Sequence, residues 1–145
     1  MPIKILAIDD DVAMTELLTL LLKTYNFEVI AANSGEDGVQ QLREHQPDVV
    51  LLDLMMPGMD GWHVCKAVRE FSNVPILILS ALDNPGMVAS ALDAGADDYL
   101  IKPVPSGVLV AHLNRLVRRT TIRSTRAETP HKTAPLIPDS NPILP

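Results

Sequence analysis

The sequence has little of several features on which common protein classes depend. Its 145 residues include one cysteine, which excludes an intrachain disulfide framework and a multi-cysteine metal site. Aromatic residues make up 3% of the chain, too few for an aromatic-rich β-sandwich. No apolar run reaches about 18 residues, and the start of the chain, Met1 to Lys4, lacks the layout of a signal peptide. We therefore expect a cytoplasmic protein with no membrane-spanning segment.

Basic charge is also scarce over most of the chain. Residues 1–114 hold 16 acidic and 6 basic side chains, whereas residues 115–145 hold 6 basic and 2 acidic ones. An acidic body disfavours nucleic acid as a partner, because phosphates require a basic surface. The arginines from Arg115 to Arg126 could grip phosphates, but no aromatic residue lies among them to stack on a base. They are more typical of the cationic end of a helix.

Short runs rich in Val, Ile and Leu recur along the chain, with helical patterns between them. There are five such runs: Ile3–Ile8, Phe27–Ala31, Asp48–Leu52, Pro75–Leu79 and Tyr99–Ile101. Runs of this kind are typical of strands buried on both faces of a parallel sheet. Their alternation with helices predicts a three-layer α/β fold, a doubly wound (βα)5 domain with a five-stranded parallel sheet.

The segments between the runs carry the expected helix signals. Apolar stripes at helical spacing comprise Met14, Leu17, Leu18, Leu21 and Leu22 in the first helix and Leu109, Leu113, Leu116 and Val117 in the last. Ser34, Asp60 and Asn84 are predicted N-caps. From about residue 120 the helical pattern stops and five prolines follow. We therefore predict one folded domain over residues 1–119 and a Pro-rich flexible tail over 120–145, with no room for a second folded domain.

Polar side chains follow four of the five predicted strands. Asp9–Asp11 follow the first strand, Asp53 the third, Ser80 the fourth and Lys102 the fifth. In an open α/β sheet ligands bind outside the carboxyl ends of the strands, so these groups are expected to meet at one edge. Each also has a structural explanation on its own: helix capping for the aspartates or the serine, a turn for Asp53, and a snorkelling lysine. All four together on one edge favour a site.

Three carboxylates beside a single ammonium group repel each other, and a bound divalent cation would offset this repulsion. Mg²⁺ or Mn²⁺ suits such oxygen ligands. With the cation on one side and Lys102 on the other, the edge would receive a phosphoryl group, and Ser80 would donate a hydrogen bond to it. Asp53, which stands alone on its strand, is better placed as a nucleophile than the paired Asp9 and Asp10.

Other chemistries find little support. The sequence has neither GxGxxG nor GxxxxGK[ST], so a nucleotide-binding loop is not indicated. The four histidines are scattered without zinc-ligand spacing. Cys65, Trp62 and Tyr25 are interpreted as packing residues.

Four motifs in order resemble one known family. The segments ILAIDDD (5–11), LLDLMMPGMDG (51–61), ILILSA (76–81) and AGADDYLIKP (94–103) are similar to those of receiver domains of two-component response regulators. The resemblance covers residues 1–119. It is strongest to receivers of winged-helix transcription regulators, and it implies the flavodoxin-like strand order 2-1-3-4-5.

The resemblance also implies a role for each site residue. Asp53 would be the phosphoacceptor, and Mg²⁺ would be held by Asp10, Asp53 and the backbone carbonyl of Met55, with Asp9 assisting. Ser80 and Lys102 would bind the phosphoryl group, and Tyr99 would occupy the aromatic switch position. The peptide bond between Lys102 and Pro103 would be cis. The implied protein is a signalling switch rather than a turnover enzyme.

The implied partners are a sensor histidine kinase or a histidine phosphotransfer protein, and a downstream protein that the sequence does not name. Relatives in the winged-helix subfamily dimerise through ion pairs, but residues 81–95 contain neither Lys nor Arg. Val108 and His112 also replace the usual Glu and Arg. We therefore expect a monomer or a weak dimer. The alternative functions are a phosphorelay intermediate, an unphosphorylated protein-binding scaffold, a DNA-binding regulator and a phosphatase.

Overall fold

The computed structural model describes residues 1–126, with side chains described through residue 120. Strands and helices alternate along the chain. In order they are β1 (Ile3–Ile8), α1 (Val12–Lys23), β2 (Phe27–Ala32), α2 (Gly35–His45), β3 (Val49–Leu52), α3 (Gly61–Arg69), β4 (Ile76–Ser80), α4 (Pro85–Asp93), β5 (Asp98–Ile101) and α5 (Ser106–Arg126). All five predicted strands are confirmed, and their predicted bounds differ by at most about one residue at either end.

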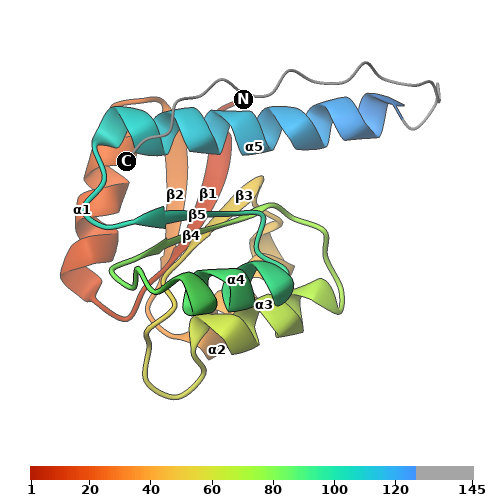
Figure 1. Ribbon diagram of the computed structural model, residues 1–145. Helices are drawn as coiled ribbons and strands as arrows, with labels where there is room; N and C mark the ends of the chain where they lie inside the picture. The colour runs from red at the N-terminus through yellow and green to blue at the C-terminus, as the bar shows by residue number, and fades with distance from the viewer. Residues whose placement is uncertain (127–145) are drawn as a thin grey trace.

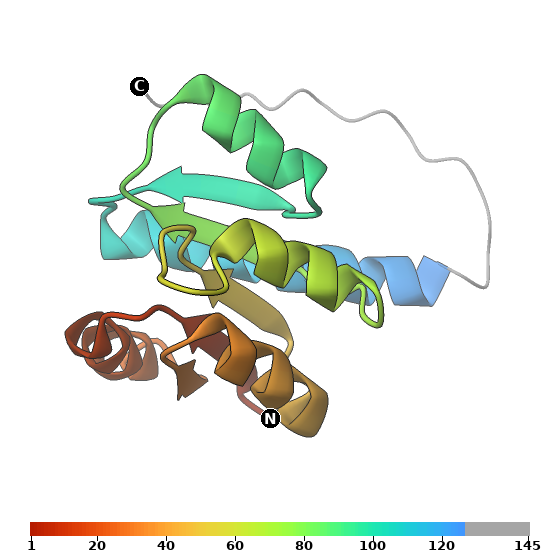
Figure 2. The ribbon, with the colours of Figure 1, turned by 90° about the horizontal axis from the view of Figure 1, so that it is seen from below.

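The five strands form one parallel sheet in the order β2-β1-β3-β4-β5. Helices α1 and α5 cover one face of the sheet, and α2, α3 and α4 cover the other (Figures 1 and 2). The predicted doubly wound fold and its strand order are therefore confirmed. The connections leave β1 and β3 toward opposite faces, so the carboxyl ends of these two neighbouring strands form the switch point at which such folds bind ligands.

Apolar side chains pack against both faces of the sheet. Leu6, Ile8 and Val50 point toward the α2–α3–α4 side, whereas Ile5 and Leu51 point toward α1 and α5. The alternation follows from the two-residue period of a strand. Within the part of the chain that the structure describes, four polar or charged residues are buried: Asp9, Thr15, Asp53 and Ser80. Three of them directly follow or end a strand at the carboxyl edge, so the buried polarity is concentrated there.

The predicted caps are observed. Ser34 accepts a hydrogen bond from the amide of Asp37, Asp60 from His63, and Asn84 from Gly86 and Met87. Asp11 caps α1 by accepting from the amides of Ala13 and Met14. A capping role is therefore the observed role of Asp11 alone among the three consecutive aspartates. The N-cap of α4 is Asn84 and not Ser80.

Three predictions about packing and boundaries were wrong. Leu17 is 58% exposed, because α1 packs through the narrower ridge of Thr15, Leu18 and Leu22. Tyr25 is 42% exposed, and its hydroxyl lies 3.3 Å from the Ser106 hydroxyl at the start of α5. Helix α5 continues beyond residue 119 to Arg126, since no Gly or Pro interrupts residues 120–126.

The rest of the predicted tail, residues 127–145, lies outside the described residues, as do the side chains of Arg123 and Arg126. Over the residues that are described, none of the helices combines the length and the apolar character needed to cross a membrane.

Candidate functional site

Two neighbouring strands bring the predicted acidic residues together. Ile8 pairs with Leu52 in the parallel ladder, so the next residues, Asp9 and Asp53, leave the sheet side by side. The amide of Asp53 donates to the carbonyl of Ile8 at 3.0 Å, which continues the ladder to the site itself. Carboxylate oxygens of Asp9, Asp10 and Asp53 all lie within 4.8 Å of one another. Asp9 and Asp53 are buried and Asp10 is exposed, so the cluster opens to solvent on one side.

Lys102 reaches this cluster from β5. Its Nζ lies 3.3 Å from Oδ2 of Asp9, and its amide donates to the carbonyl of Ser80. The other oxygen of Asp9, Oδ1, accepts from the amide of Asp11 at 3.0 Å. The ammonium is thus directed into the site and does not snorkel away from it. The peptide bond between Lys102 and Pro103 is cis, as predicted.

The electrostatics of Asp53 reflect its position. Burial, and after it the charge of Asp9, raise the pKa of Asp53 above its ordinary value, and Lys102 and hydrogen bonds from the Met55 amide and Ser80 offset only part of this. The Lys102 charge therefore does not neutralise the cluster. A divalent cation among these oxygens would supply the missing positive charge, and an all-oxygen donor set fits Mg²⁺ or Mn²⁺.

Ser80 and Tyr99 both contact the segment between β4 and α4. Ser80, fully buried, accepts a hydrogen bond from the amide of Leu82 at 3.3 Å. The Tyr99 hydroxyl donates to the carbonyl of Leu82 at 2.7 Å. Burial raises the pKa of Tyr99, and the nearby Asp53 and Asp83 charges add to this effect against a hydrogen bond with Ser80. One residue, Leu82, thus connects the two predicted switch side chains.

Several residues that organise the edge were not predicted. The Asn33 carboxamide, after β2, donates to the carbonyl of Asp9 and to the hydroxyl of the buried Thr15. The strand-end position of Asn33 was the available signal, since it is the same signal that pointed to Asp53. For Thr15 the sequence holds no comparable signal, because a lone threonine within a helical apolar pattern is common.

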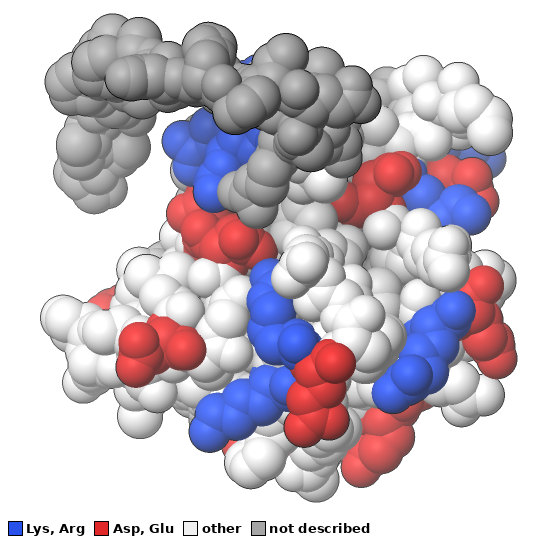
Figure 3. Space-filling view, turned by 90° about the vertical axis from the view of Figure 1, so that its right-hand side faces the viewer, with Lys and Arg blue, Asp and Glu red and all other residues white. Residues whose placement is uncertain are grey.

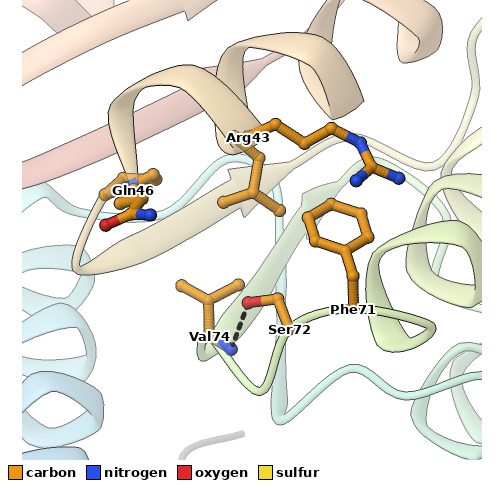
Figure 4. A pocket seen from close by; sticks show the side chains of 7 residues that line it. Arg43, Gln46, Phe71, Ser72 and Val74 are labelled. Atoms are coloured by element: carbon orange, nitrogen blue, oxygen red, sulfur yellow. Dashed lines mark hydrogen bonds between the residues drawn. The ribbon is translucent and has the colours of Figure 1, made fainter.

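A separate pocket lies at the opposite edge of the sheet, beside the amino ends of β3 and β4 (Figure 4). Its volume is about 380 Å³, and the guanidinium of Arg43 lies over the ring of Phe71 at 3.8 Å from the centroid. Ser72 and Val74 line its floor. None of the predicted site residues borders this pocket, so the predicted chemistry belongs to the carboxyl edge.

A doubly wound sheet whose carboxyl edge carries buried carboxylates, a serine and a lysine agrees with the receiver-domain class that the sequence motifs resemble. The response regulator receiver domain family matches residues 5–114 of the chain. The chain therefore belongs to the response regulator receiver domain family, and it is the receiver domain of a two-component response regulator, a class of signalling switches. The predicted family resemblance is confirmed.

Curated relatives agree with this assignment. The chain is 42% identical over 121 residues to the transcriptional regulatory protein AfsQ1 of Streptomyces coelicolor, a match that covers 83% of this chain and 54% of that protein. It is 41% identical over 116 residues to the DNA-binding response regulator MtrA of Mycolicibacterium paratuberculosis, which covers 80% and 52%. The chain thus spans about half the length of these relatives.

Solved structures of response regulators also resemble the chain. A putative response regulator from Chloroflexus aurantiacus superposes with a TM-score of 0.77 at 36% identity, covering 82% of this chain and all of that one. The acidic cluster of Asp9, Asp10 and Asp53 is consistent with the pocket at which receiver domains bind Mg²⁺.

Proposed function

We propose that the chain is a phosphorylation-dependent switch in which Asp53 accepts a phosphoryl group from a phosphohistidine of a sensor histidine kinase. The observation that carries this proposal is the juxtaposition of buried Asp53 with Asp9, Asp10 and Lys102 at the switch point. Asp10, Asp53 and the Met55 carbonyl would hold Mg²⁺, with Asp9 assisting, and Mn²⁺ suits the same ligands. The bound cation would neutralise charge on the phosphoryl oxygens.

Three residues of the chain take part in the proposed phosphoryl transfer. A carboxylate oxygen of Asp53 attacks phosphorus as the phosphorus–nitrogen bond breaks, and the electron pair returns to the histidine imidazole. Lys102 pairs with one phosphoryl oxygen and the Ser80 hydroxyl donates to another. The chain promotes its own phosphorylation and later hydrolysis, and it turns over no separate substrate.

The signal leaves the site through the β4–α4 segment. A phosphoryl group adds about −1.5 to −2 charges and strong acceptor oxygens to Asp53. Drawing the Ser80 hydroxyl toward them breaks its contact with Leu82, the residue whose carbonyl also holds Tyr99. Tyr99 then turns inward, and the surface formed by α4, β5 and α5 shifts toward a partner-binding state. The downstream partner is a protein.

The test is direct phosphorylation in vitro. The protein is incubated with acetyl phosphate, with and without Mg²⁺, and its intact mass is recorded. A gain of about 80 Da, the mass of one added HPO₃ group, that requires Mg²⁺ supports the proposal. No gain in mass, together with no change of Trp62 fluorescence on addition of beryllofluoride, would favour the unphosphorylated scaffold instead.

Met55 is expected to set the lifetime of the phosphorylated state. Its side chain is 58% exposed two residues after Asp53, where an apolar group hinders the approach of water to the aspartyl phosphate. Met55→Asn should speed dephosphorylation about tenfold, because a polar side chain can orient the attacking water. Loss of the phosphoryl mass over time after removal of acetyl phosphate measures this rate. Leu20→Asn, which replaces another exposed apolar side chain in the second half of α1, is the control. Equal rates for the parent and Met55→Asn would contradict the expectation.

Phosphorylation is expected to leave the chain monomeric or weakly dimeric. The two acidic residues beside β5 are already bound within the chain: Asp97 pairs with Arg69 at 2.9 Å, and Asp98 lies 2.6 Å from His112 Nδ1 and 2.9 Å from Arg115. They are not free to pair with a second copy. Light scattering with beryllofluoride and Mg²⁺ should give the monomer mass, and a stable dimer would contradict this.

Nucleic-acid binding is not part of the proposed function, although the relative MtrA is named a DNA-binding response regulator. The chain matches about half of that protein. On the face shown in Figure 3, Lys and Arg side chains are interspersed with Asp and Glu, without a broad basic area.

A phosphorelay intermediate is the second candidate function, since the same Asp53 chemistry run in reverse would pass the phosphoryl group to a histidine phosphotransfer protein. Transfer of label from the phosphorylated chain to such a protein distinguishes the two.

A further inference from the structure

The β1–α1 turn, which carries the acidic residues, is hydrogen-bonded to the side chain of Asn33. The Asn33 carboxamide nitrogen donates to the carbonyl oxygen of Asp9 at 2.8 Å and to Oγ1 of Thr15 at 3.1 Å. Oγ1 of Thr15 lies 3.1 Å from the carbonyl of Val12, to which it donates. The connection after β2 is thereby bonded both to the start of the β1–α1 turn and to the first turn of α1.

These contacts enclose the residues on which the cation site depends. Asp9 is one point of attachment, and Asp10 lies between it and Thr15. The carboxylates of Asp9 and Asp10 lie within 4.8 Å of that of Asp53. Before a cation binds, three carboxylates at this separation repel one another and favour opening of the turn. A hydrogen bond to the backbone of Asp9 opposes that opening without using any carboxylate oxygen that a cation needs. Metal sites depend on outer contacts of this kind, which orient the ligands themselves.

We propose that Asn33 and Thr15 are positioning residues for the divalent cation, acting through the backbone of Asp9 and the turn that follows it. The proposal rests on the proposed function, because it assumes that the acidic cluster binds Mg²⁺. It goes beyond that function by adding a side chain from the connection after β2, which contributes no acidic group to the cluster.

The burial of the two residues points to this role. Thr15 is 2% exposed in the α1 ridge that otherwise consists of Leu18 and Leu22. A hydroxyl at this place weakens the apolar packing unless it is hydrogen-bonded. The Thr15 hydroxyl donates to the Val12 carbonyl and accepts from the Asn33 carboxamide. Asn33 itself is exposed, so its side chain adds little to the core. Its two hydrogen bonds are what the residue contributes.

The experiment is a Mg²⁺ titration followed by ¹H–¹⁵N NMR of the backbone amides in the β1–α1 turn. Four variants are compared with the parent. Asn33→Ala removes the donor, and Thr15→Val removes the hydroxyl at constant shape. Thr15→Ser keeps the hydroxyl but loses a buried methyl group, and Asn73→Ala makes the same chemical change at the opposite edge of the sheet.

Asn33→Ala and Thr15→Val should each raise the Mg²⁺ dissociation constant by about tenfold, the usual effect of removing an outer contact at a metal site. The double variant should be little worse than Asn33→Ala, since Asn33→Ala already removes the hydrogen bond to Thr15 together with the one to the Asp9 carbonyl. Thr15→Ser and Asn73→Ala should keep the parent value. The rate of phosphorylation by acetyl phosphate should recover in Asn33→Ala at saturating Mg²⁺, which a general loss of structure would not allow.

The outcomes separate this inference from the proposed function. If the parent itself shows no saturable Mg²⁺ response, the proposed function fails. If the parent binds Mg²⁺ and Asn33→Ala binds it equally well, the positioning role is wrong and the proposed function stands. If Thr15→Ser weakens binding more than Thr15→Val, packing rather than the hydrogen bond controls the site, and the inference is overturned.

Discussion

Asp53→Asn is expected to abolish the Mg²⁺-dependent gain of a phosphoryl group and, without metal, to make the protein more stable than the parent. The first effect follows from the loss of the attacking carboxylate. The second follows from the raised pKa of Asp53, caused first by burial and then by the charge of Asp9. An acid with a higher pKa in the folded than in the unfolded state binds its proton more tightly when folded, so its ionised form opposes folding.

The sign of this effect fixes its pH dependence. The destabilisation is complete above the folded pKa of Asp53 and disappears as the pH falls toward the ordinary value of 3.8. Thermal melts without metal should therefore give Asp53→Asn a higher Tm than the parent at neutral pH, with a gap that narrows on acidification. Added Mg²⁺ should raise the Tm of the parent and have less effect on the variant.

The exposed Glu28 on β2 offers the matched control. Glu28→Gln also removes one negative charge, but from a solvated position, and it should change neither phosphorylation nor the metal-free Tm to a comparable extent. A phosphoryl gain that persists in Asp53→Asn would place the acceptor elsewhere. A lower Tm for Asp53→Asn at neutral pH would show that the buried carboxylate stabilises the fold.

The residues at the carboxyl edge of the sheet were predictable because adjacent parallel strands end at the same edge, so the residues that follow them lie close together. Asp9 and Asp53 are 44 positions apart, yet each directly follows an apolar run, and adjacent strands end together. The same rule applied to Ser80 and Lys102, whose strands also end at this edge. Pairing of β1 with β3 rather than with another strand came from the family resemblance and not from the runs, since buried strands look alike in sequence.

Hydrogen bonds from side chains to backbone carbonyls could not be predicted, because every residue has a carbonyl and the sequence does not indicate which one accepts. Arg69 shows this clearly. Its guanidinium donates to the carbonyls of Gly95, Ser72 and Val74 and to the carboxylate of Asp97. It thereby joins the end of α3 to the α3–β4 connection and to the α4–β5 connection. The hydrogen bond from Asn33 to the Asp9 carbonyl belongs to the same category, so the position of Asn33 after β2 does not reveal its role.

The exposure of Leu17 was missed for another reason. A helix that packs on a sheet buries a ridge, and an apolar pattern in the sequence does not tell which of two adjacent leucines lies on it. In α1 the ridge passes through Leu18 and Leu22, so Leu17 faces outward. The apolar content of a helix thus predicts that it packs, while its rotation about its own axis depends on the sheet beneath.

Gly61→Ala is the substitution outside the acidic cluster from which we expect the largest loss. Gly61 begins α3, and its amide donates to the carbonyl of Leu54 at 2.9 Å. A Cβ added there would lie 2.6 Å from the carbonyl oxygen of Asp53 and 2.7 Å from Cα of Leu54. Both are backbone atoms of the segment that carries Asp53, so relief of the clash must move that segment.

The expected cost is about 1–3 kcal/mol, the usual range for overpacking, which lowers the Tm by several degrees in a domain of this size. Phosphorylation should slow as well, because attack requires the Asp53 oxygen to be in line with the phosphorus. Gly107→Ala is the control, since no atom lies within 4 Å of the added Cβ. Alanine should there stabilise the first turn of α5 by about 0.5–1 kcal/mol. Urea unfolding and the phosphorylation rate measure both variants. If Gly61→Ala matched the parent in both, the backbone after β3 would be free to yield, and close contact with α3 would not be what fixes the position of Asp53.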